Sequence, residues 1–317
     1  MARLLVTGGA GFIGSHIVAA ALAAGHHVRV LDDLSTGSLA NLAPWRDQIE
    51  LLVGDVADPA LAARAVAGMD WVSHQAARIS VAESLAQPAR YARVNTLGTV
   101  VLLEAARAAG VRRFVFASTA AVYGDPPTLP VSEATPPHPR SPYGAAKLAA
   151  ELFCATIAAD LPVVALRYFN VYGPRQDPHS PYAAVICAFI DRLLRGQPPV
   201  VYGTGEQTRD FISVQDVAQA NLLALAAETR GFTVLNIATG QARSVLELVA
   251  TLNTLCQTQL GPQFAPPRPG DILHSVAAVE AAAEQIGFRA RADWLTTLAE
   301  TVQWYRTRGS GAPPARD

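Results

Sequence analysis

Short apolar runs alternate with longer alanine-rich stretches through the first half of the chain. The alanine-rich stretches predict helices at Phe12–Ala24, Leu61–Val66 and Ala89–Ala109. Because strands that alternate with helices form βαβ units, the pattern predicts a parallel sheet buried on both faces and joined by right-handed crossovers. The predicted strands are Arg3–Val6, His27–Leu31, Ile49–Val53, Met69–Ser73, Arg113–Ala117 and Val163–Arg167.

The regular alternation is interrupted at Pro126–Pro142, where the density of proline excludes a helix or a central strand and predicts a surface loop. A helix is expected to restart at Ser141, since serine is a good N-cap and Pro142 suits the first helical position. After Asn170 the alternation becomes irregular, which predicts a smaller lobe that follows the sheet.

Composition narrows the class of protein. The chain has 317 residues, of which 50% are hydrophobic and 16% charged, so a disordered chain is excluded. The net charge of -1 provides no basic excess for nucleic acid, and no apolar run approaches the length needed to span a membrane. Three cysteines without a CxxC pair make no disulfide framework and favour the cytoplasm, and the histidine spacing indicates no metal site.

A glycine-rich turn joins the first predicted strand to the first helix, with glycines at Gly8, Gly11 and Gly14. Such a turn lets a pyrophosphate approach the backbone, and the helix N-terminus then offers it free N–H groups. A glycine-rich turn also occurs as an ordinary tight strand-to-helix connection, so the spacing predicts a dinucleotide site only together with its context.

Acidic residues follow the second and third predicted strands. Asp32 lies 18 residues after Gly14, close to the spacing of the carboxylate that binds the adenosine ribose, and its charge favours NAD over NADP. The adjacent Asp33 is a second candidate, although its turn favours a solvated position. Asp55 is placed either to bind the adenine amino group or to cap the helix that begins near Asp58.

Tyr143 and Lys147 lie one helical turn apart on the helix that follows the proline-rich loop. A nearby cation favours the phenolate, which makes the tyrosine a general base. Thr119 ends the fifth strand, and ligands of open α/β sheets bind at the carboxyl ends of the strands. We therefore predict that Thr119 binds the same substrate hydroxyl that Tyr143 deprotonates.

These motifs resemble the extended short-chain dehydrogenase/reductase superfamily, and within it the UDP-glucose 4-epimerases and their relatives that act on N-acetylated sugars. The resemblance rests on segments 7–14, 117–124, 141–147, 166–174, 203–205, 209–212 and 268–271, with Asp32. It implies a Rossmann-type doubly wound sheet with a smaller C-terminal α/β substrate lobe. The NAD-binding domain would comprise 1–166, joined by about 209–236, and the nucleotide-sugar lobe 167–208 and 237–317.

By resemblance, the expected activity is NAD-dependent 4-epimerisation of a UDP-hexose, with Thr119, Tyr143 and Lys147 as the catalytic trio and Lys147 also holding the nicotinamide ribose. The expected partners are a UDP-sugar and a second copy of the chain, paired through a four-helix bundle; the alternative for those helices is ordinary packing on their own sheet. The other cofactor contacts implied are Gly8, Gly11, Phe12, Ile13, Gly14, Asp32, Asp33, Asp55, Val56, Gln75, Ala76, Ala77, Asn95 and Tyr168.

The substrate residues implied by the resemblance are Asn170 for the diphosphate region and Arg209, Arg268 and Asp271 as a clamp on the nucleotide sugar. Taken singly, each arginine is typical of a surface salt bridge, and the motif around each favours the clamp. Ser275 matches a pocket-wall position where a small residue leaves room for an N-acetyl group, so N-acetylated substrates are expected in addition to plain hexoses.

Related 4,6-dehydratases carry an acidic pair directly after the threonine, and related decarboxylases place a glutamate in this stretch. Here the two positions are Ala120 and Ala121, which transfer no proton, so elimination of water is disfavoured. The alternatives are another transformation of a nucleotide sugar, such as reduction or epimerisation elsewhere on the ring, and a non-catalytic dinucleotide-sensing protein.

Overall fold

The computed structural model describes residues 1–177, 185–267 and 272–309. Its centre is a seven-stranded sheet in the order β10-β6-β5-β4-β1-β2-β3, and all its strand pairs are parallel, as predicted. This is the order of a doubly wound dinucleotide-binding sheet. The strands are β1 (Arg3–Thr7), β2 (His27–Asp32), β3 (Ile49–Val53), β4 (Trp71–His74), β5 (Arg113–Thr119), β6 (Val163–Tyr168) and β10 (Phe232–Ile237).

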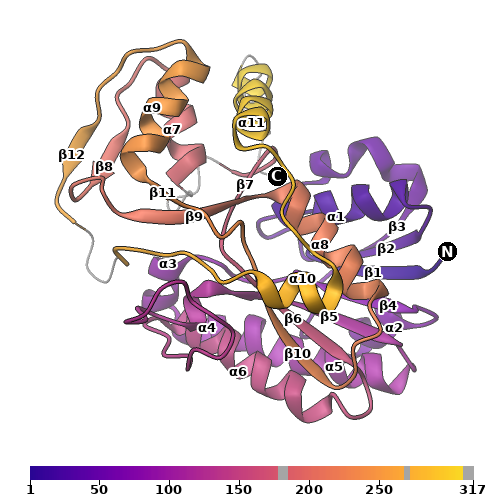
Figure 1. Ribbon diagram of the computed structural model, residues 1–317. Coiled ribbons are helices and arrows are strands. Elements are labelled where there is room, and N and C mark those ends of the chain that lie inside the picture. Colours follow the sequence, from indigo (N-terminus) through magenta and orange to yellow (C-terminus); the bar gives the residue numbers. More distant parts are fainter. Residues whose placement is uncertain (178–184, 268–271, 310–317) are drawn as a thin grey trace.

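Helices cover both faces of this sheet (Figure 1). One apolar core joins the sheet to α1 (Phe12–Ala23), α8 (Val214–Ala226) and α10 (Glu280–Ile286). A second core joins the other face to α2 (Pro59–Val66), α5 (Gly98–Ala108) and α6 (Pro142–Ile157). Each leucine or valine buried completely in these cores contributes about 1.5–3 kcal/mol, which fixes the strand ends that carry the site.

The helix predicted over 89–109 is not one regular α-helix. It begins as α4 (Pro88–Tyr91), widens into a π-helical segment over Ala92–Leu97 and continues as α5. π-helical segments inserted into α-helices often mark functional sites, and here the insertion places Asn95 in the interior. A further helix, α3 (Val81–Ala86), was not predicted; Ser80 caps it by accepting from the Glu83 N–H at 3.0 Å.

The proline-rich segment forms the predicted loop, and α6 begins where its cap predicts. The Ser141 hydroxyl accepts from the Gly144 N–H at 3.1 Å, and Pro142 occupies the first helical turn. Within the loop, Val131 donates its N–H to the carbonyl of Val276 at 2.8 Å, which ties the loop to the second half of the chain.

The second half of the chain builds a smaller lobe at the carboxyl edge of the main sheet (Figure 1). Strand β9 pairs with β7 and β11, whereas α8 and β10 return to the main sheet. The exact division into domains stays a prediction. The lobe contains β7 (Asn170–Tyr172), β8 (Val200–Tyr202), β9 (Thr208–Ser213), β11 (Ala242–Ser244), β12 (Gln263–Ala265), α7 (Val185–Leu194), α9 (Val245–Cys256) and α11 (Trp294–Gly309).

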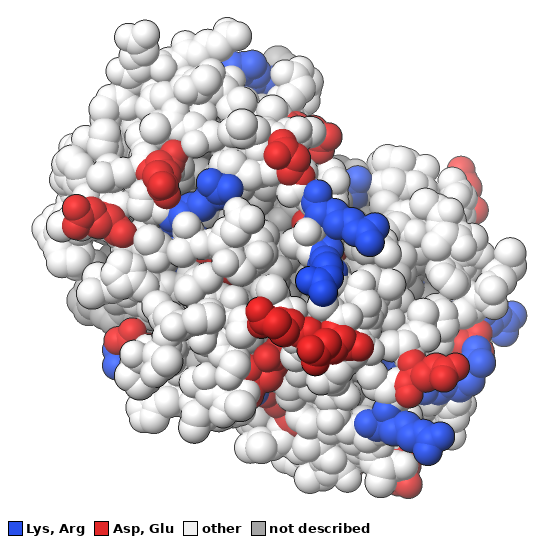
Figure 2. Space-filling view, in the orientation of Figure 1, with Lys and Arg blue, Asp and Glu red and all other residues white. Residues whose placement is uncertain are grey.

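On the face shown in Figure 2, Lys and Arg side chains are scattered among Asp and Glu side chains, and much of the surface is uncharged. Within the described part of the chain, no helix is both long and apolar enough to cross a membrane. In the same residues, no group of three or more His, Cys, Asp and Glu side chains is placed to hold a metal ion.

Candidate active site

The glycine-rich turn packs too closely against its neighbours for any side chain. Gly8 has φ +66°, and a Cβ there would lie 2.7 Å from the Ala76 nitrogen. A Cβ on Gly14 would lie 2.1 Å from the carbonyl oxygen of Gly8. The turn therefore rests against Ala76, which the sequence also predicted at the cofactor site.

The first turn of α1 has the properties of a phosphate-binding helix end. Its N-cap is Gly11, which has no side chain to occupy the N–H groups around Phe12 and Ile13. Together with the Gly8–Gly14 cradle, this arrangement fits the pyrophosphate of a dinucleotide.

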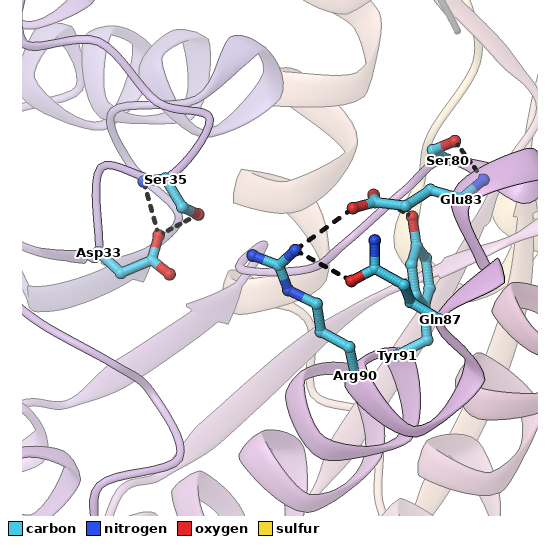
Figure 3. A network of polar contacts seen from close by, with 7 residues as sticks. All are labelled: Asp33, Ser35, Ser80, Glu83, Gln87, Arg90 and Tyr91. Atoms are coloured by element: carbon cyan, nitrogen blue, oxygen red, sulfur yellow. Dashed lines mark hydrogen bonds and ion pairs between the residues drawn. The ribbon is translucent and has the colours of Figure 1, made fainter. Parts of the chain in front are cut away.

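Asp32 lies at the end of β2 and is 6% exposed. Its Oδ2 accepts from the Ala10 N–H at 2.9 Å and its Oδ1 from the Leu34 N–H at 2.8 Å, so it is anchored to the glycine turn with lone pairs left for a ribose diol. Burial raises its pKa, and these two backbone bonds act the other way. Asp33 is exposed and accepts from the backbone and hydroxyl of Ser35, which agrees with the solvated turn position (Figure 3).

Asp55 does not cap the helix after β3, so that interpretation is wrong. The N-cap is Asp58, whose Oδ1 accepts from the N–H groups of Ala60 and Leu61. Asp55 instead accepts from the Ala57 N–H at 2.8 Å and pairs with Arg93 at 2.7 Å, and Val56 beside it is buried.

Gln75 and Tyr168 belong to a hydrogen-bond network at the carboxyl ends of β4 and β6. Tyr168 donates to Oε1 of Gln75 at 3.2 Å, and Nε2 of Gln75 donates to Ser73 and Asn221. Asn221 in turn donates to the Tyr168 hydroxyl at 2.8 Å. The network fixes the position of Gln75, directly before the turn of Ala76 and Ala77.

The side chain of Asn95 binds the backbone of Arg78, which directly follows this turn. It accepts from the Arg78 N–H and donates to the Arg78 carbonyl, both at 2.8 Å. His74, also close to this turn, is a packed polar residue bonded to Thr7 at 2.7 Å and Thr99 at 3.0 Å. Burial lowers the pKa of His74 to about 3, so its ring is neutral.

Thr119, Tyr143 and Lys147 are brought together where β5 ends and α6 begins. The Thr119 hydroxyl hydrogen-bonds to the Tyr143 phenol. The Lys147 side chain is 2% exposed, donates to the Ala117 carbonyl at 2.7 Å and lies 4.8 Å from the centre of the Phe116 ring. A phenol and a threonine hydroxyl thus meet at the carboxyl edge of the sheet, with an ammonium buried behind them.

Burial is the largest influence on titration at this trio, and the expectation that Lys147 favours the Tyr143 phenolate stays a prediction. Burial raises the pKa of Tyr143, and the Thr119 hydrogen bond opposes that shift. Burial lowers the pKa of Lys147 itself to about 7, partly offset by Cys154 and Glu151.

Sequence reasoning missed Tyr91, which packs edge-on against Tyr143. Its hydroxyl donates to Oε2 of Glu83 at 2.9 Å, and Arg90 donates to Glu83 and Gln87, so α3 and α4 together hold the Tyr91 ring (Figure 3). Two features of the sequence could have indicated this role. Tyr91 is an aromatic residue within a polar stretch, and Glu83 precedes it by eight residues.

Three of the predicted substrate residues lie in the described part of the small lobe. Asn170 is exposed at the start of β7, and Arg209 on β9 donates to the Thr208 carbonyl at 2.9 Å. Ser275 donates its N–H to the Thr208 carbonyl at 3.2 Å, which places it next to Arg209. Arg268 and Asp271 lie outside the described residues.

Asp210, beside Arg209, organises this part of the lobe. It is fully buried and accepts from the Thr239 N–H and hydroxyl, the Gly240 N–H and the Ala277 N–H at 2.6–3.3 Å. It therefore joins β9, the turn after β10 and the segment that follows Ser275.

The sequence profile of the NAD dependent epimerase/dehydratase family matches residues 4–238. The chain belongs to this NAD-dependent family. The chemistry of the glycine cradle, the uncapped first turn of α1 and Asp32 fits NAD, the cofactor of the family.

Individual members of the family are similar over nearly the whole chain. A UDP-glucose 4-epimerase of Mycolicibacterium smegmatis is 40% identical over 96% of this chain and 99% of its own. The structure of UDP-N-acetylglucosamine 4-epimerase from Methanobrevibacter ruminantium, in complex with UDP-N-acetylmuramic acid, has a TM-score of 0.93 at 38% identity, covering 97% and 99% of the chains. That of Thermus thermophilus UDP-glucose 4-epimerase with NAD has a TM-score of 0.87 at 39% identity, covering 96% and 99%.

Proposed function

We propose that the protein is an isomerase that interconverts UDP-hexoses differing in configuration at C4, using NAD. The observation that carries the proposal is the trio of Thr119, Tyr143 and Lys147 at the mouth of a dinucleotide site, with no acidic residue at the next two positions. NAD held at this site would supply reversible hydride transfer at C4 of the sugar.

Tyr143 takes the proton of the sugar 4-hydroxyl as hydride leaves C4, and it returns that proton when the 4-keto sugar is reduced. Thr119 holds the same hydroxyl through its side chain. Lys147 holds the nicotinamide ribose and provides positive charge behind the phenol. Phe12, Ile13 and the glycine turn bind the pyrophosphate, while Asp32 holds the adenosine ribose.

Epimerisation and dehydration share the oxidation at C4, and they differ in what happens next. Loss of water from the 4-keto sugar needs a proton donor near C6. Ala120 and Ala121 follow Thr119 in a short 3-10 turn, and neither side chain can donate a proton. The site therefore favours return of hydride to the same carbon.

The substrate is proposed to be a UDP-sugar, held by Asn170, Arg209, Arg268 and Asp271. A guanidinium binds phosphate oxygens well because its donors match their geometry. Ser275 lies beside Arg209 through the Thr208 backbone and adds little bulk, so N-acetylated sugars are proposed as substrates alongside UDP-glucose and UDP-galactose.

A homodimer through α5 and α6 is part of the proposal. The inner faces of both helices pack on the main sheet, as the alternative interpretation expected. Apolar residues remain exposed nearby: Leu152 and Phe153 on α6 are 63% and 44% exposed, and Leu97, at the end of the π-helical segment that leads into α5, is 49% exposed. A second copy of this face would cover them in a four-helix bundle. A cytoplasmic location is also proposed, supported by three buried cysteines that form no disulfide in the described part of the chain.

The test is incubation of the NAD-loaded protein with UDP-glucose, UDP-galactose and their N-acetylated forms, followed by chromatography. We expect each active sugar to approach an equilibrium mixture with its C4 epimer, without net formation of NADH. Accumulation of a 4-keto-6-deoxy product, or no conversion of any UDP-sugar, would overturn the proposal.

A further inference from the structure

A buried ion pair lies one helical turn beyond Lys147. Glu151 on α6 and Arg167 on β6 are 2% and 5% exposed. Arg167 donates from Nε to Oε1 of Glu151 at 3.0 Å and from Nη2 to Oε2 at 2.6 Å. Because the cost of burying two charges offsets much of the gain from pairing them, stability alone gives little reason for this pair.

The pair is tied to the strand that ends in Thr119. The Ser118 hydroxyl donates to Oε1 of Glu151, and Lys147 donates to the carbonyl of Ala117. Ser118 is also the register partner of Arg167 in the sheet. Helix α6 is therefore fastened to β5 at the two residues directly before Thr119.

The pair also decides what Lys147 can bind. Glu151 follows Lys147 by four residues, so the two side chains share one face of α6, and an unpaired carboxylate there would attract the ammonium. Both oxygens of Glu151 are instead occupied, by Arg167 and Ser118. Lys147 is left with the Ala117 carbonyl and the face of the Phe116 ring.

Other titratable groups surround Lys147 and Tyr143. Cys154 and Glu151 act on Lys147 from its own helix, and Glu151 is the carboxylate among them. The groups on other elements are His74 on β4, Tyr123 after β5, Arg167 on β6, Tyr91 on α4 and Glu83 on α3.

We propose that Arg167 is a positioning residue for the reaction: it holds Glu151 away from Lys147, so that the ammonium stays available to favour the Tyr143 phenolate. The proposal rests on the assignment of Tyr143 as the base, and it does not depend on which sugar is bound.

The proposal predicts opposite effects for the two partners. Without Arg167, Glu151 binds Lys147, the positive charge near the phenol is neutralised, and Tyr143 ionises at higher pH. Without the Glu151 charge, Arg167 and Lys147 both favour the phenolate, and Tyr143 ionises at lower pH. A pair that merely stabilises the fold would lower stability in both variants and produce no such opposition.

The experiment titrates Tyr143 directly in the NAD-loaded protein. Arg167→Met, Glu151→Gln and the double variant are each prepared with and without Tyr143→Phe, and the difference in tyrosinate absorbance isolates this one phenol. We expect the ionisation constant to fall by about tenfold in Arg167→Met, to rise in Glu151→Gln and to lie near the unmodified value in the double variant.

The matched control is Arg113→Met. Arg113 is another buried arginine of the same sheet, 8% exposed at the opposite end of β5, where it donates to the carbonyls of Ala227 and Thr229. We expect it to lower stability and leave the Tyr143 titration unchanged. Shifts of the same sign in the two single variants, or no shift in either, overturn the proposal.

If a single variant fails to fold, Ser118→Ala replaces it, since this change removes one partner of Glu151 and leaves Arg167 in place. We expect a smaller shift of Tyr143 ionisation to higher pH, and its absence overturns the proposal. Because the readout uses no sugar, it stays separate from the test of 4-epimerisation.

Discussion

The ring of Tyr91 stands edge-on to the ring of Tyr143, with centroids 6.4 Å apart and an interplanar angle of 86°. Tyr91 is completely buried, and its hydroxyl is bound by Glu83 at 2.9 Å. The proposed base is therefore oriented by a second tyrosine, which is held from the opposite side by a carboxylate.

This contact predicts a graded response at position 91. Tyr91→Phe keeps the ring and removes the hydrogen bond to Glu83, so we expect about 1 kcal/mol less stability and nearly full activity. Tyr91→Ala removes the ring and should cost about 3–5 kcal/mol and much of kcat. Urea unfolding and steady-state kinetics measure both; equal kcat in the two variants would show that the ring does not orient Tyr143.

Tyr143→Phe removes the phenolic oxygen while keeping the ring that packs against Tyr91. We expect conversion of UDP-sugars to fall by about 100- to 10,000-fold, because a general base is lost. NAD content and thermal melting should be unchanged. Near-normal turnover in this variant would rule out Tyr143 as the base.

Asp32 and Asp33 form a matched pair for testing cofactor choice. We expect Asp32→Ala to weaken NAD binding by about 10- to 100-fold and to reduce the preference over NADP, because a buried carboxylate that faces the ribose is lost. Asp33→Ala should change neither, since Asp33 is exposed and bonded to Ser35. Fluorescence titration with both cofactors measures this, and equal affinity of the unmodified protein for both would contradict it.

Ser275→Tyr should suppress N-acetylated substrates selectively. A phenol ring beside Arg209 would occupy the space needed by the N-acetyl group, whereas plain hexoses avoid the clash. Ser275→Ala is the control for loss of the hydroxyl and should keep both activities. The ratio of kcat/KM for UDP-N-acetylglucosamine and UDP-glucose is the measurement, and a ratio that Ser275→Tyr leaves unchanged would remove Ser275 from the pocket wall.

The lowered pKa of the buried His74 ring makes the free energy of unfolding depend on pH. Its pKa is about 3 in the folded protein, where burial lowers it from 6.5, so between these values the unfolded chain binds more protons. The stability it provides is complete above pH 6.5 and is lost as pH falls below that value, by about 2 kcal/mol at pH 5.

Urea unfolding at pH 7 and pH 5 tests this dependence. His74→Gln can keep bonds to Thr7 and Thr99 without a titrating group, so its loss of stability between the two pH values should be smaller. His138→Gln, at an exposed histidine in the proline-rich loop, is the control. An equal loss in all three proteins would contradict the assignment to His74.

The parallel sheet could be predicted from the sequence because its strands are continuous apolar runs between helices. The meeting of Thr119, Tyr143 and Lys147 could be predicted because a four-residue spacing and a strand end are local features. The π-helical segment at Ala92–Leu97 could not, since its apolar pattern continues that of the flanking α-helical turns.

The ion pair of Glu151 and Arg167 shows a different limit. The two residues are 16 positions apart on a helix and a strand, so no spacing rule connects them. One feature of the sequence does indicate a buried ion pair. Arg167 is the single charged residue in the strand Val163–Tyr168, and a buried strand contains a charged side chain only where a partner of opposite charge binds it.

The position of β10 beside β6 has a consequence for folding while the chain is being synthesised. The chain leaves the main sheet after Tyr168 and completes its edge only when Phe232–Ile237 emerges. At about 5–20 residues per second, β6 waits several seconds on the ribosome with its outer edge unpaired and without α8 to cover its face. A fragment that ends at residue 168 would keep this state permanently, and we expect it to aggregate through that edge, so no single cut between the lobes releases a foldable dinucleotide-binding domain.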